Sequence, residues 1–261
     1  MIAALRYEWV RVTTVRSTRL VLGFVLVLSA LLAWLSTGPQ AIYDETGTEI
    51  GTAPIDWWGA FGGPLGLTAV LAGVVAAQAI GQEYRFGLIR LTLTAFPDRV
   101  QILVAKLVVV VGAAIVFTLV SYLGSAVGVT VRGHPLPPDD AVSPGSAYLL
   151  RGVVFVVLWA LSAFALAGVT RQTAIGIAVP IVSGLIVEQL LMALLADRAL
   201  WLVSNLPWSS AGRWGQELSS PRGGSLFGQD VSVGWAALGV FAVWVAVFLA
   251  VEVVAFLRRD A

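Results

Sequence analysis

Residues 102–131, ILVAKLVVVVGAAIVFTLVSYLGSAVGVTV, form a run of thirty residues with a single charge, that of Lys106. A helix needs about 20 predominantly apolar residues to cross the hydrocarbon core of a bilayer. Since this run exceeds that length, it predicts a membrane-spanning helix that is tilted or that extends past the bilayer. We therefore expect the chain to fold in a membrane.

The composition of the whole chain is also typical of a membrane protein. The 261 residues are 58% hydrophobic and 12% charged, with a mean hydropathy of +0.89, whereas soluble domains average about 25% charged residues. The chain has no cysteine and one histidine, His134, so we expect no disulfide and no metal site. Its net charge of +1 gives no reason to expect nucleic acid as a partner.

Six apolar segments are long enough to be predicted as spans. The first is short, and we interpret it as a retained anchor, because the charged region before it is long for a signal peptide and contains Glu8. The sequence thus predicts an all-α membrane protein with one transmembrane domain over residues 1–261. The six spans are expected at about residues 20–35, 61–80, 102–131, 149–169, 174–195 and 234–257.

The basic residues predict the orientation of these spans. If the N-terminus is cytoplasmic, eleven of the sixteen Lys and Arg residues fall on the inner side and five on the outer side. We therefore predict a multi-pass protein with both termini in the cytoplasm. Richness in Arg, Ala, Val and Gly with a single lysine suggests a bacterium, and hence its inner membrane.

The N-terminal arm, about residues 2–18, is predicted to be an amphipathic helix in the headgroup layer. Its apolar residues recur at spacings of three and four, whereas most of its arginines, including Arg6 and Arg11, lie off that stripe. A solvated basic tail is the alternative interpretation. The predicted apolar stripe consists of Ile2, Leu5, Trp9 and Val12.

The connection of residues 196–233 is too long and too aromatic for a solvated turn. It contains Trp201, Trp208 and Trp214, which indicate short re-entrant helices between spans five and six. Elsewhere, Gly73-x-x-x-Ala77 and Gly124-x-x-x-Gly128 permit close helix approach, either within one bundle or between two copies. Pro64 and Pro180 are expected to kink spans two and five.

Catalytic chemistry is not indicated by the sequence. The one lysine, Lys106, lacks the preceding glycine loop of a phosphate-binding motif, so no ATPase is encoded. Two acids lie within apolar segments, where a carboxylate is unfavourable unless paired or hydrated. Glu188, beside Gln189, is either a polar packing residue or a residue of a translocation path. Glu252 is close enough to Arg258 to be paired.

A charged loop connects spans two and three. Residues 81–99, GQEYRFGLIRLTLTAFPDR, hold five charges in nineteen residues and form the largest loop on the predicted cytoplasmic side. With the six spans and the amphipathic arm, this loop resembles that of ABC-2 type permeases, the membrane subunits of ATP-binding-cassette exporters. The positions matching the family pattern are Glu83, Gly87, Pro97, Arg99 and Lys106, although Gly87 is followed by leucine where the family often has threonine.

The resemblance implies a function for this loop. Its residues, with Arg85 and Arg90, would form the coupling contact with a separate ATPase subunit, present in two copies. ATP and Mg²⁺ would bind to that partner and not to this chain. A second permease copy or a sister permease would complete the path for an amphipathic cargo: a drug, a lipid-like molecule or a hydrophobic peptide. The alternatives are an integral membrane enzyme using Glu188 and Glu252, or an immunity or scaffold protein without transport activity.

Overall fold

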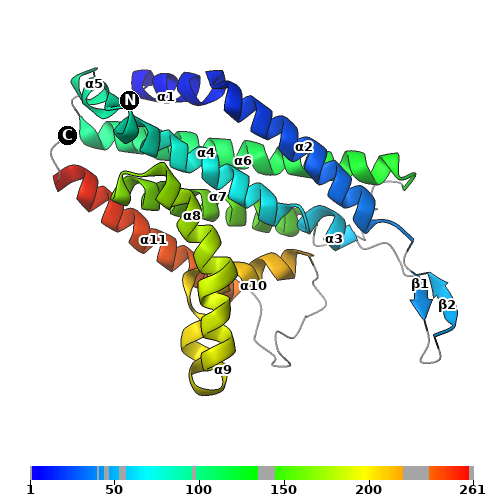
Figure 1. Cartoon of the computed structure of the whole chain (residues 1–261). Helices are drawn as coiled ribbons and strands as arrows, with labels where there is room; N and C mark the ends of the chain where they lie inside the picture. Colours follow the sequence, from blue (N-terminus) through cyan, green and yellow to red (C-terminus); the bar gives the residue numbers. More distant parts are fainter. Residues whose placement is uncertain are drawn as a thin grey trace.

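The computed structural model describes residues 2–39, 41–43, 47–52, 57–95, 98–134, 145–219 and 235–258. Within these residues it has six helices long and apolar enough to cross a membrane, which confirms the predicted fold class (Figure 1). Each overlaps one predicted segment. The spans are Arg16–Ser36, Gly59–Arg85, Arg99–Val131, Leu149–Thr170, Thr173–Leu195 and Trp235–Arg258.

The helices of the described residues follow these spans closely. Spans one, three and six are the single helices α2 (Arg16–Ser36), α6 (Arg99–Val131) and α11 (Trp235–Arg258), and span four lies in α7 (Gly145–Thr170). Span two contains α3 (Trp57–Gly62) and α4 (Leu65–Arg85), and span five contains α8 (Thr173–Val182), the π-helical turn η1 (Ser183–Val187) and α9 (Glu188–Ser204).

The two expected prolines lie at these interruptions. Pro64 is the residue before α4, where the chain has left α3. Pro180 lies inside α8, three residues before η1 begins. Because proline removes a backbone donor and clashes with the preceding turn, both positions agree with the local change in helix geometry.

Close packing of α2 on α6 uses the predicted small residues. A Cβ atom at Gly124 would lie 2.5 Å from the carbonyl oxygen of Leu26, and one at Gly128 would collide with Ala30 of α2. Gly73 likewise lies against Trp159 and Ala163 of α7. Of the two alternatives, the structure thus shows packing within one bundle for both motifs. The buried core lies mainly among α4, α6 and α7.

The N-terminal arm forms α1 (Ile2–Thr14), which ends earlier than expected. Val15 is extended, with φ −66° and ψ 120°, and Arg16 already begins α2. Helix α1 packs against α6 through Ala4, Glu8 and Val12. Ile2 and Trp9 of the predicted stripe are exposed. The stripe is therefore turned partly away from the bundle, and the buried face of α1 includes a carboxylate.

The described part of the connection between spans five and six contains a short helix, as predicted. Helix α9 is broken at Ala199 (φ −146°, ψ 40°), where the chain turns back before the helix ends at Ser204 (Figure 1). Helix α10 (Pro207–Ser219) then packs on α11 and α7. Trp208 and Trp214 of α10 are buried, whereas Trp201 of α9 is exposed.

A hairpin of β1 (Ala41–Tyr43) and β2 (Glu49–Thr52) was not expected. Both strands are short and lack a long apolar pattern.

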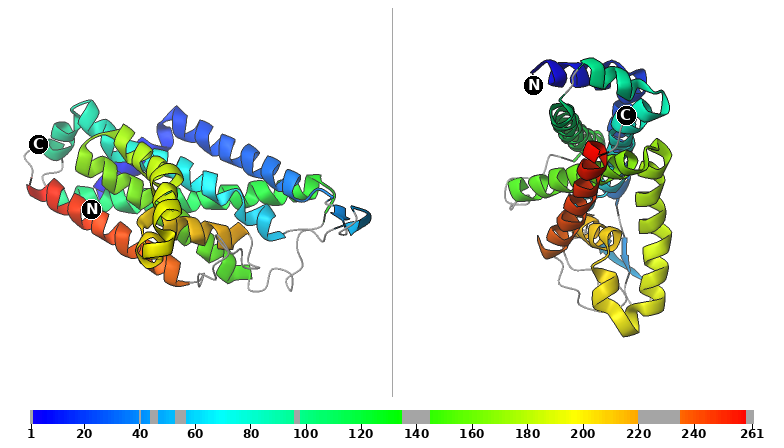
Figure 2. Two further views of the ribbon diagram at one scale, coloured as in Figure 1. Left: turned by 60° about the horizontal axis from the view of Figure 1, so that its bottom comes forward. Right: turned by 90° about the vertical axis from the view of Figure 1, so that its left-hand side faces the viewer.

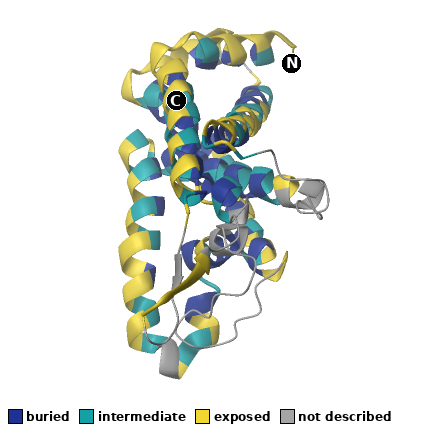
Figure 3. Cartoon of the chain, turned by 90° about the vertical axis from the view of Figure 1, so that its right-hand side faces the viewer, coloured by how far each residue is buried: buried dark blue, intermediate teal, exposed yellow. Residues whose placement is uncertain are grey.

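The N-terminus, α5 (Leu88–Ala95) and the last turn of α11 gather at one end of the bundle, here called the α5 end (Figures 1 and 2). The β-hairpin lies at the other end (Figure 1). Span five extends away from the bundle. In its apolar central stretch 11% of the residues are buried, compared with 61% of those in span two. Exposed residues therefore run along most of this span (Figure 3).

Candidate functional site

The charged loop forms a tight turn between α4 and α5. Phe86 and Gly87 close α4 through hydrogen bonds from their backbone N–H groups to the carbonyls of Gln82 (3.0 Å) and Tyr84 (3.3 Å). Gly87 has φ +66°, a left-handed conformation that glycine adopts without steric cost. Helix α5 can therefore begin at once and lie across the end of the bundle.

The other side of α5 is fixed by the start of α6. The carboxylate of Asp98 accepts hydrogen bonds from the backbone N–H groups of Val100 (3.0 Å) and Gln101 (3.2 Å), which caps α6. Ile89 and Thr92 of α5 are buried. Helix α5 is thus held against the bundle by its buried face and by the tight turn that follows α4.

The outer face of this turn is apolar and exposed. Phe86, Leu88 and Leu91 are 64%, 43% and 68% exposed, and the exposed arginines Arg85 and Arg90 lie among them. Large apolar side chains at the tip of a charged loop indicate a surface that another molecule covers. We call these five residues the α5 knob.

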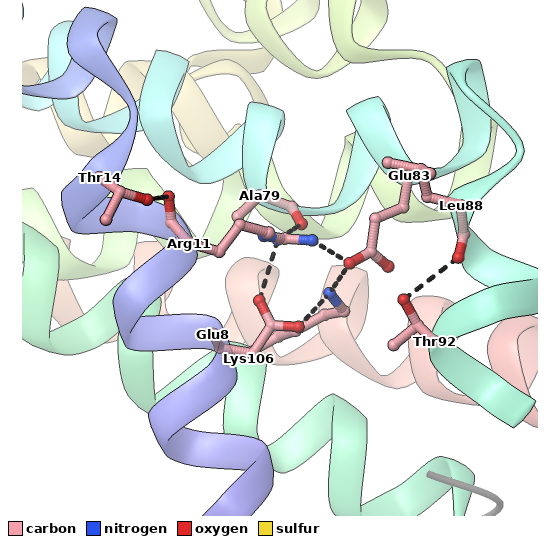
Figure 4. Close-up of polar contacts among 8 residues, drawn as sticks. All are labelled: Glu8, Arg11, Thr14, Ala79, Glu83, Leu88, Thr92 and Lys106. Atoms are coloured by element: carbon pink, nitrogen blue, oxygen red, sulfur yellow. Dashed lines mark hydrogen bonds and ion pairs between the residues drawn. The ribbon is translucent and has the colours of Figure 1, made fainter. Parts of the chain in front are cut away.

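Four charged side chains, called the buried charge cluster, meet at the last turn of α4, just before the α5 knob in the chain (Figure 4). The ammonium nitrogen of Lys106 lies 2.7 Å from Glu8 Oε1 and 2.6 Å from Glu83 Oε1. Arg11 contacts Glu8 at 2.9 Å, and it also pairs with Glu83 and donates to the carbonyl of Ala79. Two positive and two negative groups thus neutralise each other.

The buried charge cluster joins three segments that are far apart in the sequence. Glu8 and Arg11 belong to α1, Glu83 to α4 and Lys106 to α6. The side chains of Glu8, Glu83 and Lys106 are 1% exposed or less. Removing one partner of such a buried pair leaves an uncompensated charge, which destabilises by about 3–5 kcal/mol. Because the partners lie on different helices, movement of α1 or of the end of α4 relative to α6 would change the ion pairs of this cluster.

The structure divides the predicted coupling residues into two groups. Arg85, Gly87 and Arg90 are exposed at the α5 knob, whereas Glu83 and Lys106 are buried and have no surface to offer a partner. The guanidinium of Arg99 donates to the carbonyl of Phe256 on α11 at 3.4 Å. Pro97 lies outside the described residues.

The predicted interfacial residues are also divided. Arg6 and Trp9 are exposed and Leu5 is half-buried, while Arg11 turns into the buried charge cluster. Glu8 was not selected as a site residue from the sequence. The sequence feature that could have indicated Glu8 is an acid three residues before an arginine in an otherwise basic arm. This feature does not predict the pairing with Lys106, which is 98 positions away.

Glu188, one of the two predicted residues of a translocation path, is buried against α10. Its carboxylate is 4% exposed and accepts hydrogen bonds from the backbone N–H of Trp208 at 3.2 Å and from that of Ser209. It therefore caps the N-terminus of α10, where a negative charge is favourable. Gln189 is exposed and donates to the carbonyl of Gly184 at 3.4 Å.

The two intramembrane acids have separate surroundings. Glu188 binds α10, whereas Glu252 lies against Gly168 of α7. The idea of an enzyme that uses both carboxylates together gains no support from this placement. Among the described residues, no group of three His, Asp or Glu side chains could hold a metal ion.

A family model described as ABC-2 family transporter protein matches residues 13–187, about two thirds of the chain. The chain belongs to the ABC-2 transporter family. The match includes α4, the α5 knob, the start of α6 and spans one to four. No curated protein matches the chain.

Family membership fixes the general role of this chain. It is the permease, the membrane subunit of an ABC transporter, and it crosses the bilayer several times. Proteins of this family associate with an ABC ATPase. The ABC-2 permease described above thus offers one exposed loop and one buried ionic contact at the same end of its bundle.

Proposed function

We propose that the α5 knob docks on the ATPase subunit and that the buried charge cluster transmits the resulting movement into the bundle of an exporter. The observation that carries this proposal is the exposure of Phe86, Leu88 and Leu91 within eight residues after the buried Glu83. Apolar side chains of this size fit a groove on a soluble partner. Arg85 and Arg90 would set the register of that contact more than its affinity.

The orientation follows from the same end of the molecule. The α5 end carries the N-terminal arm, the α5 knob and Arg258 of α11, so it collects most of the basic residues. By the positive-inside rule this end faces the cytoplasm, where the ATPase subunit binds ATP and Mg²⁺. We infer a bacterial inner membrane and two cytoplasmic termini.

We infer a second permease subunit from the exposed apolar face of span five. Its described residues Val179, Leu185, Ile186, Leu190 and Leu194 are exposed, and the span leaves the bundle (Figure 2). A second copy, or a sister permease, would cover part of this face and enclose a path between the two bundles. Two ATPase copies would then act on two α5 knobs. Apolar walls suit an amphipathic cargo such as a drug, a lipid-like molecule or a hydrophobic peptide.

The docking of the α5 knob is tested by a matched pair of variants. Leu91→Glu places a charge in the proposed contact, and Ile50→Glu places the same charge on β2 at the other end of the molecule. The two side chains have similar exposure, 68% and 64%. We expect the tagged Leu91→Glu permease, purified from membranes of its native host, to lose its ATPase subunit, while Ile50→Glu retains it.

The readouts are the amount of co-purified ATPase and the ATP hydrolysis of the complex in vesicles. Equal recovery and equal hydrolysis for both variants would refute the docking contact. Arg90→Glu is the second variant. Because it changes only charge, we expect a smaller loss that grows at low ionic strength.

A further inference from the structure

Glu252 is a buried carboxylate near the end of α11, and neither of its oxygens has a hydrogen-bond partner. The residue is 1% exposed. Its Cγ atom lies so close to Gly168 of α7 that a Cβ atom there would approach it to 2.7 Å. Since a buried carboxylate without hydrogen bonds is unfavourable, this position requires a partner that the present conformation does not supply.

Lys106 is a buried cation of α6, the helix that packs against α11, and its ammonium is paired with Glu8 and Glu83 rather than with Glu252 in this conformation. The ammonium of a lysine has three donors, and Glu8 and Glu83 occupy two of them. The flexible four-carbon side chain of Lys106 can move the ammonium to a new partner while α6 stays in place.

The other cations described near this carboxylate are less buried than Lys106. Arg99, at the start of α6, donates to the carbonyl of Phe256. Arg258 is exposed in the last turn of α11, and Arg171, beyond Gly168, is exposed and lies over the ring of Tyr84. Among the described residues of α6 and α11, Lys106 is the buried cation.

We propose that Glu252 is a second acceptor for Lys106, and that the ammonium passes from Glu8 and Glu83 to Glu252 when the α4–α5 turn moves. The exchange rests on the proposed function, because the ATPase would supply that movement. In the present conformation Lys106 ties α1 and α4 to α6. After the exchange it ties α11 to α6 instead.

Arg11 makes the exchange feasible. It contacts both Glu8 and Glu83, so these two carboxylates keep a cation when Lys106 leaves them. Each arrangement has a discrete set of partners, as expected for a two-state element that a nucleotide can bias. Glu252 is then a positioning residue for the conformational cycle.

The test compares two conformations of the complex of permease and ATPase in nanodiscs. Glu252→Gln keeps a neutral acceptor, and Glu252→Met removes the acceptor while conserving volume. Thermal unfolding is measured without nucleotide and with Mg-ATP and vanadate. Without nucleotide, neither variant should unfold below the wild-type Tm, because Glu252 has no partner to lose there, and Glu252→Met should raise the Tm because it removes an unpaired buried carboxylate. In the trapped complex both should unfold roughly 4 °C lower or more.

Two further readouts separate this role from a structural one. ATP hydrolysis by the variant complexes should fall about tenfold, the order expected for loss of a hydrogen bond between charged groups. Glu8→Gln should show the opposite thermal pattern, with its larger loss in the nucleotide-free complex. A purely structural Glu252 would shift both conformations alike.

Equal Tm shifts in the two conformations, or no shift in either, would overturn the exchange. If the wild-type permease retains an active ATPase in those experiments, the proposed function stands and the exchange alone is wrong. If no ATPase is recovered with the wild-type permease, both proposals are wrong.

Discussion

Replacing Lys106 by methionine should detach α1 from the bundle. Met fills most of the space of the lysine side chain but cannot donate to Glu8 or Glu83, which lie 2.7 Å and 2.6 Å from the ammonium. Both carboxylates are 1% exposed, and Arg11 alone would have to neutralise them. From the usual effect of breaking a buried ion pair, we expect the bundle to lose about 3–5 kcal/mol.

The absence of cysteine from the chain allows a direct assay of this detachment. Val12, on the buried face of α1, is 9% exposed, so Val12→Cys places a single protected thiol under the helix. If the loss falls on α1 alone, a change of 3 kcal/mol raises the open fraction about a hundredfold. Maleimide labelling of Val12→Cys should accelerate accordingly when Lys106→Met is added.

Arg6→Met is the matched control, because Arg6 is an exposed cation on the same helix and its loss should change stability by less than about 0.5 kcal/mol. Adding Glu83→Gln to Lys106→Met should slow the labelling again, since it removes one unpaired charge. Identical labelling rates with Lys106→Met and with Arg6→Met would refute the role given to the buried charge cluster.

Three other substitutions test separate parts of the structure. Gly128→Ala should destabilise the α2–α6 contact by about 1–3 kcal/mol, because the new Cβ atom meets Ala30. Gly23→Ala on α2 is the control and should be neutral or stabilising, since nothing lies within 4 Å of the new Cβ atom. Thermal unfolding in detergent distinguishes the two variants. Gly87→Ala should cost about 1–2 kcal/mol because φ is +66°, and ATPase co-purification should fall with it. Glu188→Gln should weaken the cap of α10 by about 0.5–2 kcal/mol, seen as faster proteolysis within residues 207–219; protection equal to that of the wild type would show that the cap does not hold α10.

The spans could be predicted because their signal is local. About 20 apolar residues in sequence satisfy a bilayer regardless of which helices they later contact, so all six were placed. The short α10 followed from the density of tryptophan in residues 196–233. The hairpin of β1 and β2 carries no such signal, since strands of three and four residues rely on pairing rather than on an apolar pattern.

The site was harder to predict because its contacts are long-range. Glu83 and Lys106 were expected to face a partner, because their positions match the family pattern of the coupling loop. Their burial depends on Glu8 and Arg11, which the chain brings back from its first turns. Likewise, the cap of α10 by Glu188 spans 20 positions, a contact that the local sequence does not indicate. The rotation of α1 was missed for the same reason, since the cluster rather than the apolar stripe sets its buried face.

The α4–α5 turn owes its two-sided character to helix geometry. Successive residues of a helix are about 100° apart, so a residue two positions on points to nearly the opposite side. Glu83 therefore faces inward to Lys106 while Arg85 faces outward, and Phe86 is exposed just after the helix ends. In the proposed function, force applied to the α5 knob would reach Glu83 through the last turn of α4. Because the ionic partners of Glu83 lie on α1 and α6, a small movement of that turn acts on three helices at once, which is the property that a coupling element in a permease requires.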